Sequence, residues 1–325
     1  MKFKKNYYQR IDEAPPEYQN LSVSHNDAGE GVFFARELEH IKAKSYDIKF
    51  PFLKARKILP LSFDTNAGAT RITYQQYTQV GMAKIIANYA DDLPRADVLG
   101  KEFSSPVREI GSSYGYNIKE IASAKMAGKP LNARRANAAK RSCMVRENNI
   151  AFNGDSVSGL KGFLNAENIS EVVLDADGMG NSKEFSKKTA DNIIRDITRL
   201  PTHVHTVSKG VEIADTLLLP LSQYNLISNL RLPDTNISVR KWILAENPHL
   251  KKIDWLDELR TAGAGNTARM MVYRYDPDAL TLEITQEFSQ RPVQEKGLEF
   301  TVPCWMGTGG VIVYYPLSIA YADGI

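Results

Sequence analysis

Residues 70–80 read TRITYQQYTQV, a stretch rich in threonine, tyrosine and isoleucine that predicts a β-strand. Residues 81–100 then carry glycines and a proline, which interrupt regular structure. Residues 101–112 can return as a second strand. We therefore expect residues 69–112 to form a long hairpin with a broad tip.

This hairpin is not expected to be stable by itself, because it has only two strands. At about 3.3 Å per residue, such a strand spans roughly 36 Å. A two-stranded hairpin is marginal alone in water, and its open edges invite pairing with another chain. It must therefore pack on its own domain or lie across a neighbouring subunit, and both options remain open. The polar Gln75, Gln76 and Gln79 favour a wet surface between subunits.

The residues before the hairpin have an irregular pattern. Pro15 and Pro16 block a helix there. Residues 35–44 predict a short helix, because Phe34, Leu38 and Ile41 recur at helical spacing. Residues 1–56 are interpreted as an extended arm, and a disordered terminus is the alternative.

Residues 117–152 predict the strongest helical stretch. Asn117 is a suitable N-cap and Glu120 follows three residues later, as in a capping box. Gly128 and Pro130 interrupt, and a second helix is expected from there to about Phe152. Its apolar positions form a narrow stripe of mostly small residues that would let the helix lie close to a sheet: Ala136, Ala139, Cys143 and Ile150.

Basic residues occupy much of the rest of this second helix: Arg134, Arg135, Lys140, Arg141 and Arg146. A solvated face explains them as well as a face turned toward a polyanion, where neutralisation of phosphates drives binding. The net charge of the chain is only +3, so any contact with nucleic acid should be local.

Further elements follow with less distinctive patterns. An amphipathic stretch covers 182–200, and 215–221 is apolar enough for a buried strand. Short helices are expected at 224–230 and 237–247, and strands at 269–275 and within 280–321. Val311–Tyr315 is a continuous apolar run that suits a central strand.

The bulk composition indicates an ordinary soluble globular chain, with 43% hydrophobic and 24% charged residues. Cys143 and Cys304 stand far apart, which argues against a disulfide framework or a cysteine zinc site and suits a reducing cytoplasm. No secretory signal and no membrane span are expected.

No catalytic, metal or cofactor site is predicted. His203 and His205 would share one face of a strand, but no third metal ligand lies nearby. Cys304 has no local base. Asp175 and Asp177 resemble half of a calcium loop without its glutamate. Residues 307–310 (GTGG) precede a strand rather than a helix and are interpreted as a turn.

Several motifs, taken in order, resemble the major capsid proteins of tailed phages with the Hong Kong 97-like fold, in the branch without a large fused scaffolding segment. They are KILPL at 57–61, TY at 73–74, GMAKII at 81–86, YADDLPR at 89–95, SYGY at 113–116, the helix with Ala122, Ala124, Leu131, Ala133 and Arg134, 149–154, GLKGFLN at 159–165, GGV at 309–311, YYP at 314–316 and YADGI at 321–325.

The resemblance implies an α+β fold with named parts: an N-terminal arm at 1–56, a lead-in strand at 57–68, an extended E-loop hairpin at 69–112, a peripheral domain with a long spine helix at 113–175, an axial domain at 176–274, and C-terminal strands of the peripheral domain at 275–325. It implies that the E-loop extends over an adjacent subunit. The E-loop residues expected between subunits are Tyr74, Gln76, Tyr77, Lys84, Asp91, Asp92 and Arg95.

The resemblance also implies a non-enzymatic role without cofactors. Subunits would form hexamers and pentamers that close into an icosahedral shell around double-stranded DNA, assembled in the bacterial cytoplasm and retained in the virion. Further partners would be a portal and separate scaffolding or decoration proteins. The basic helix residues would contact DNA without reading its sequence. Lys84 and Lys101 lie in the hairpin, but no acceptor is identified, so crosslinking is not expected.

Two alternatives remain. An encapsulin-like nanocompartment shares the fold and encloses protein, so the particle's contents would separate the two. A cytosolic α+β hydrolase would use Cys304 or the pair His203 and His205, and substitution of those residues would test it.

Overall fold

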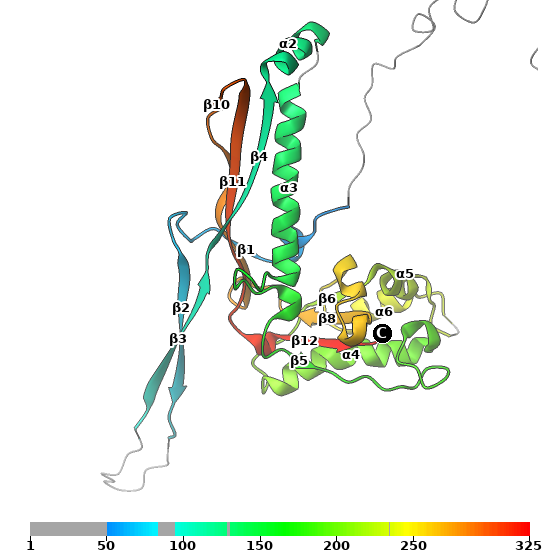
Figure 1. The fold of residues 1–325 in the computed structure, drawn as a ribbon. Helices are drawn as coiled ribbons and strands as arrows, with labels where there is room; N and C mark the ends of the chain where they lie inside the picture. The colour runs from blue at the N-terminus through cyan, green and yellow to red at the C-terminus, as the bar shows by residue number, and fades with distance from the viewer. Residues whose placement is uncertain (1–50, 84–94, 129–130, 234) are drawn as a thin grey trace, which may run out of the picture. The chain divides into compact units, whose positions relative to one another are not determined.

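The computed structural model describes residues 51–83, 95–128, 131–233 and 235–325 (Figure 1). Residues 52–325 form one unit. The expected arm lies outside the described residues up to position 50, together with its helix at 35–44. Lys84, Asp91 and Asp92 also lie outside them.

The first sheet is built around one long strand. Its order is β1 (Leu61–Ser62), β9 (Leu280–Gln290), β11 (Glu299–Val313) and β10 (Gln294–Lys296), and β4 (Arg108–Asn117) also pairs with β11. Only β1 runs parallel to its neighbour. The apolar run that begins at Val311 was expected in a central strand, which is confirmed up to Val313, where β11 ends.

The interpretation of residues 307–310 as a turn is wrong. They lie inside β11, where its pairing with β9 shifts register between Trp305 and Gly310. Gly310 has φ 71°, which glycine adopts without strain. A Cβ on Gly309 would stand 2.5 Å from Cδ1 of Ile72. The glycines therefore permit a bulge and a close approach to the hairpin, roles that a turn-like composition does not reveal.

Two helices follow β4. α2 (Ile118–Ala127) begins with the expected capping box, in which Asn117 accepts from the Glu120 N–H at 2.8 Å. It ends at Gly128, whose φ is 62°. α3 (Leu131–Asn153) lies along the first sheet (Figure 1). The predicted helices are confirmed, and the buried part of the stripe packs on the sheet: Ala139, Cys143 and Ile150.

The second sheet has the order β5 (Ser170–Glu171), β12 (Ile319–Asp323), β8 (Arg269–Tyr273), β6 (Thr216–Leu219) and β7 (Lys252–Trp255). Every residue of β6 and β8 is buried. The strands predicted at 215–221 and 269–275 are thereby confirmed with shorter bounds.

Three helices pack with this sheet: α4 (Ala190–Val207), α5 (Leu221–Asn229) and α6 (Val239–Glu246). The helices expected at 224–230 and 237–247 are confirmed. The amphipathic stretch at 182–200 begins before the helix that it belongs to, because Thr189 caps α4 and a 3₁₀ turn precedes that cap. Other 3₁₀ turns lie at Phe163–Asn165, Asp257–Arg260, Ala264–Asn266 and Pro316–Ser318.

The expected domain boundaries do not follow the two sheets. β12 was assigned to the C-terminal strands of the first domain, yet it pairs with β8 in the second sheet. β5 falls before the expected boundary at 175 and joins the same sheet through β12. Pairing between strands that are distant in sequence decides which sheet a segment joins. The alternation of apolar and polar residues within a segment does not indicate that pairing.

The lead-in strand expected at 57–68 is mostly not a strand. α1 (Ala55–Ile58) is a single helical turn and β1 contains two residues. The side-chain oxygen of Asn148 on α3 accepts from the backbone N–H groups of Lys54 and Ala55, at 3.1 and 3.0 Å. These contacts across the fold stabilise a turn that local sequence does not predict.

The hairpin consists of β2 (Arg71–Val80) and β3 (Asp97–Pro106), paired antiparallel along their full length (Figure 1). The strand predicted at 70–80 is confirmed. The return strand expected at 101–112 is instead divided between two strands, because β3 ends at Pro106 and the chain continues at once into β4. Val107 lies between β3, which pairs with β2, and β4, which pairs with β11. Its side chain is buried, and its N–H donates to the Thr70 carbonyl at 3.0 Å.

Candidate subunit-contact surfaces

The root of the hairpin is fixed to the first sheet by aromatic rings. Tyr74 meets Tyr314 edge to face at 4.9 Å and stacks on Phe103 at 5.3 Å. Ser105 donates to the Gly309 carbonyl at 3.2 Å. Burial raises the pKa of Tyr74. Tyr74, a predicted contact between subunits, is therefore engaged within its own chain.

A buried carboxylate holds this root in place. Glu283 is 2% exposed and accepts from Tyr314 at 3.3 Å and from Thr281 at 2.6 Å. Ser62 and Thr65, which lead into the hairpin, donate to its other oxygen at 2.9 and 3.3 Å. Glu283 thus links the segment before the hairpin to Tyr314, whose ring contacts Tyr74 at the hairpin root. Its partners lie far apart in sequence, so no local pattern indicated this role.

A hollow of about 830 Å³ lies beside the root. Its lining combines aromatic rings with carboxylates, among them Tyr74, Tyr314, Asp64 and Asp278. Such a surface is open to a polar or aromatic segment of another chain, and the described residues of this chain leave it unfilled.

The far half of the hairpin is exposed on both faces. Among its apolar side chains, Tyr77 is 64%, Leu99 is 60% and Val98 is 55% exposed. Gln76 is half-buried and Arg95 is exposed. The described residues offer no third strand to β2 or β3. Exposed apolar strands with open edges are a surface that another chain can cover.

The predicted basic residues of α3 do not share one face. Successive helical residues rotate by about 100°, so Arg134 and Arg141 lie on the side away from the buried stripe. Arg135 and Arg146 flank the stripe, and Lys140 flanks its other edge and is exposed. The helix therefore presents cations around most of its circumference rather than along a single stripe.

Arg135 and Arg146 pair with carboxylates of the same chain. Arg135 bonds both carboxylate oxygens of Glu120, at 3.0 and 3.1 Å, and the Gly115 carbonyl. The hydrogen bond from Arg135 lowers the pKa of Glu120. Arg146 forms an ion pair with Asp155 at 3.4 Å. These pairs fix α3 to its neighbours and reduce the charge that both arginines offer to a polyanion.

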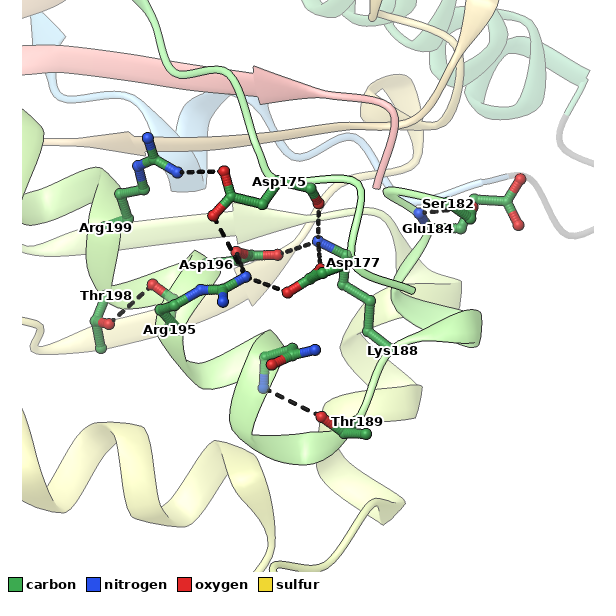
Figure 2. A network of polar contacts seen from close by, with 11 residues as sticks. Asp175, Asp177, Ser182, Glu184, Lys188, Thr189, Arg195, Asp196, Thr198 and Arg199 are labelled. Carbon is green, nitrogen blue, oxygen red and sulfur yellow. Dashed lines mark hydrogen bonds and ion pairs between the residues drawn. The ribbon is translucent and has the colours of Figure 1, made fainter. Parts of the chain in front are cut away.

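Asp175 and Asp177, considered as half of a calcium site, are paired with the chain's own cations (Figure 2). The amine of Lys188 contacts Asp177 at 2.9 Å and Asp196 at 2.5 Å. Arg195 also pairs with Asp177, and Arg199 with Asp175. The side chains of Lys188 and Asp196 are fully buried. The network joins the loop before α4 to that helix.

The remaining candidates for chemistry are dispersed. His203 and His205 lie on α4 rather than on a strand, so they do not share a face. Burial raises the pKa of the thiols of Cys143 and Cys304, which disfavours the reactive thiolates. Within the described ranges, no three His, Cys, Asp or Glu residues gather as a metal site. In those same ranges, no helix has the length and apolarity needed to cross a bilayer.

The model of the major capsid protein family matches residues 81–325. The chain belongs to this family. No curated protein matches the sequence. The capsid of Myoviridae phage XM1 superimposes with a TM-score of 0.76 at 19% identity, covering 91% of this chain and 99% of that one. The structural resemblance therefore extends over most of this chain and nearly all of that one.

Two other solved structures share the fold. The capsid of a native GTA particle gives a TM-score of 0.61 at 11% identity and covers 93% of this chain and 99% of that one. Mycobacterium phage Bobi gives 0.58 at 12% identity, with 89% and 96% covered. The α+β fold is the Hong Kong 97-like capsid fold, and the family match makes the chain a capsid shell protein.

Proposed function

We propose that the capsid protein assembles into hexamers and pentamers that close into an icosahedral shell around double-stranded phage DNA. The observation that carries this proposal is the hairpin, whose far half has exposed apolar side chains on open strands. A single copy leaves these groups in water. Identical neighbours bury them, and head-to-tail contacts close into rings when the rotation is right.

We assign roles to the parts of the chain on this basis. The hairpin from β2 to β3 is the E-loop that lies over an adjacent subunit, with Tyr77 and Arg95 among its contact residues. α3 is the spine helix, and the helices around the second sheet form the axial part nearest the symmetry axes. The arm at 1–56 would contact neighbours as well.

The inner surface would meet DNA through the cations of α3. Lys140 is exposed, and Arg134 and Arg141 lie on the side of the helix away from the first sheet. Contacts of this kind neutralise phosphates and carry no sequence information. A net charge of +3 keeps repulsion among many copies small. Assembly in the bacterial cytoplasm, with a portal and scaffolding or decoration proteins, completes the proposal.

Sedimentation velocity and negative-stain microscopy of the purified full chain test this function. We expect uniform closed particles together with ring-shaped capsomers. Particles from infected cells should contain nuclease-protected DNA, and protein cargo instead would identify an encapsulin-like compartment. A stable monomer at high concentration would contradict the proposal.

A further inference from the structure

The hollow beside the hairpin root has an acidic lining. Its volume is about 830 Å³, and four stretches of the chain contribute its side chains: 61–64, 74–77, 277–281 and 314–315. Among these described residues the charged ones are Asp64 and Asp278, and no lysine, arginine or histidine is present. The chain as a whole has 41 lysines and arginines against 38 acidic residues, so the hollow departs from the average charge of the protein.

The two carboxylates of the lining are available to a ligand. Asp64 and Asp278 are exposed, and within the described part of the chain neither forms an ion pair. Arg274 precedes Asp278 by four residues, but it pairs with Glu212 and Asp276 instead. Both carboxylates therefore face the hollow's solvent with their charge uncompensated.

A buried carboxylate adds to this negative charge. Glu283 is 2% exposed, and it accepts hydrogen bonds from hydroxyl groups that include Ser62 and Tyr314 of the lining. Hydroxyl donors satisfy the oxygens of Glu283 without neutralising its charge. Because charges are screened less in a protein interior than in water, Glu283 contributes to the potential inside the hollow.

Tyrosine rings form much of the remaining wall. Tyr74 and Tyr314 meet edge to face, while Tyr77 and Tyr315 are 64% and 44% exposed. The Tyr77 hydroxyl donates to Gln75 at 2.7 Å, which helps to hold this ring beside the hollow. Aromatic rings attract cations, more strongly where water is displaced. Tyrosine rings and carboxylates together suit an organic cation with an apolar body.

We propose that this hollow binds a linear polyamine, an alkyl chain that carries two or more ammonium groups. Its ammonium groups pair with Asp64 and Asp278, and its methylene groups lie against the tyrosine rings. Mg²⁺ and Ca²⁺ fit less well, because they need several oxygen ligands at one point and the described residues gather no such cluster. A lysine or arginine side chain of another chain brings only one charge, which leaves one carboxylate unpaired.

A bound polyamine would join three parts of the chain: the segment before the hairpin, β2 of the hairpin and the start of β9. All of the lining belongs to one copy, so the site is complete before assembly and does not depend on the shell function. A ligand that binds only the folded chain stabilises it by mass action. Polyamine binding should therefore stiffen the root on which the orientation of the hairpin depends.

Calorimetric titration of the purified full chain with spermidine is the first test. We expect saturable binding of one equivalent per subunit, and a melting temperature that rises by about 2–4 °C at ten times the Kd. Butylamine has a single ammonium group and should bind about fivefold more weakly or worse. Mg²⁺ at matched ionic strength should not displace spermidine. A lack of saturable binding, or displacement by Mg²⁺, would overturn the proposal.

Substitution of the carboxylates locates the site. Asp64→Asn and Asp278→Asn should each weaken spermidine binding by about two- to fivefold, as expected for an exposed ion pair. The double variant should lose about tenfold if the two contacts are independent. Glu171→Gln removes an exposed carboxylate of the second sheet and should leave the affinity unchanged. An equal loss for Glu171→Gln would show general attraction to acidic groups and would contradict a site in the hollow.

Substitution of Tyr77 tests the contact with the rings. Tyr77→Leu should weaken spermidine binding by about two- to fivefold, whereas Tyr77→Phe keeps the ring and should bind nearly as well as the parent. Because Tyr77 is exposed, both variants should melt like the parent when no polyamine is present. If the chain binds no spermidine and a map of assembled particles shows a lysine or arginine of another copy in the hollow, the occupant is that side chain and the proposal fails.

Discussion

The ring of Tyr314 meets the ring of Tyr74 edge to face, with centroids 4.9 Å apart. Tyr74 belongs to β2 of the hairpin, and Tyr314 directly follows β11 of the first sheet. The Tyr314 hydroxyl donates to the buried Glu283. The orientation of the hairpin root therefore depends on a ring whose own position is set by a buried hydrogen-bond network.

Substitution of Tyr314 by phenylalanine should lower stability modestly. The ring contact with Tyr74 remains, but Glu283 loses one hydroxyl donor, which costs about 0.5–1.5 kcal/mol. Urea unfolding of the unassembled subunit measures the loss. Tyr315→Phe, at the next and more exposed position, is the matched control and should have no effect. Equal stabilities for the two variants would remove Tyr314 from this role.

Lys188→Met should be severely destabilising. It leaves the buried Asp196 without the ammonium at 2.5 Å, and breaking a buried ion pair typically costs about 3–5 kcal/mol. Lys187→Met removes an exposed partner of Glu184 and should cost less than about 0.5 kcal/mol. The double variant Lys188→Met, Asp196→Leu should regain part of the stability in the same unfolding assay. A small effect of Lys188→Met alone would refute the structural role of this network.

Acid should loosen the loop that Asp177 holds. The hydrogen bond from Lys188 lowers the pKa of Asp177 below its ordinary value of 3.8. A lowered carboxyl pKa contributes stability above the unfolded value, and this contribution is lost as pH falls from about 4 through the folded pKa. Melting temperatures measured from pH 7 to pH 2.5 should fall less steeply below pH 4 for Asp177→Asn than for the parent. Asp278→Asn, at an exposed carboxylate, should follow the parent curve.

Gly162 and Gly111 should respond oppositely to alanine. A Cβ at position 162 would stand 2.3 Å from the backbone nitrogen of Gly154, so the chain must shift, at a cost of about 1–3 kcal/mol or more. Gly111→Ala meets open space and should leave the isolated subunit as stable or more stable. Thermal unfolding of both variants checks this. A destabilised Gly111→Ala subunit would mean that position 111 is constrained by its own fold.

Local features of the fold were predictable from sequence, and pairings between distant segments were not. The capping box of Asn117 and Glu120 and the strand at 70–80 involve only near neighbours, and both are present. The placement of β12 beside β8 joins segments about fifty residues apart, and glycine composition alone suggested a turn where β11 bulges.

The contact surfaces likewise combine local features that the sequence predicts with distant contacts that it does not. Tyr77 was predicted as a contact residue from its place in the hairpin and is exposed, whereas Tyr74 is engaged at the root. Glu283 was missed because its hydroxyl partners come from both ends of the sequence.

The orientation of the hairpin in an assembled particle tests the account most directly. A reconstruction of the shell by electron cryomicroscopy should show β2 and β3 of each copy lying on a neighbouring subunit, with the far half of the hairpin covered. Density in which each hairpin folds back onto its own first sheet, with its apolar side chains buried there, would contradict the account.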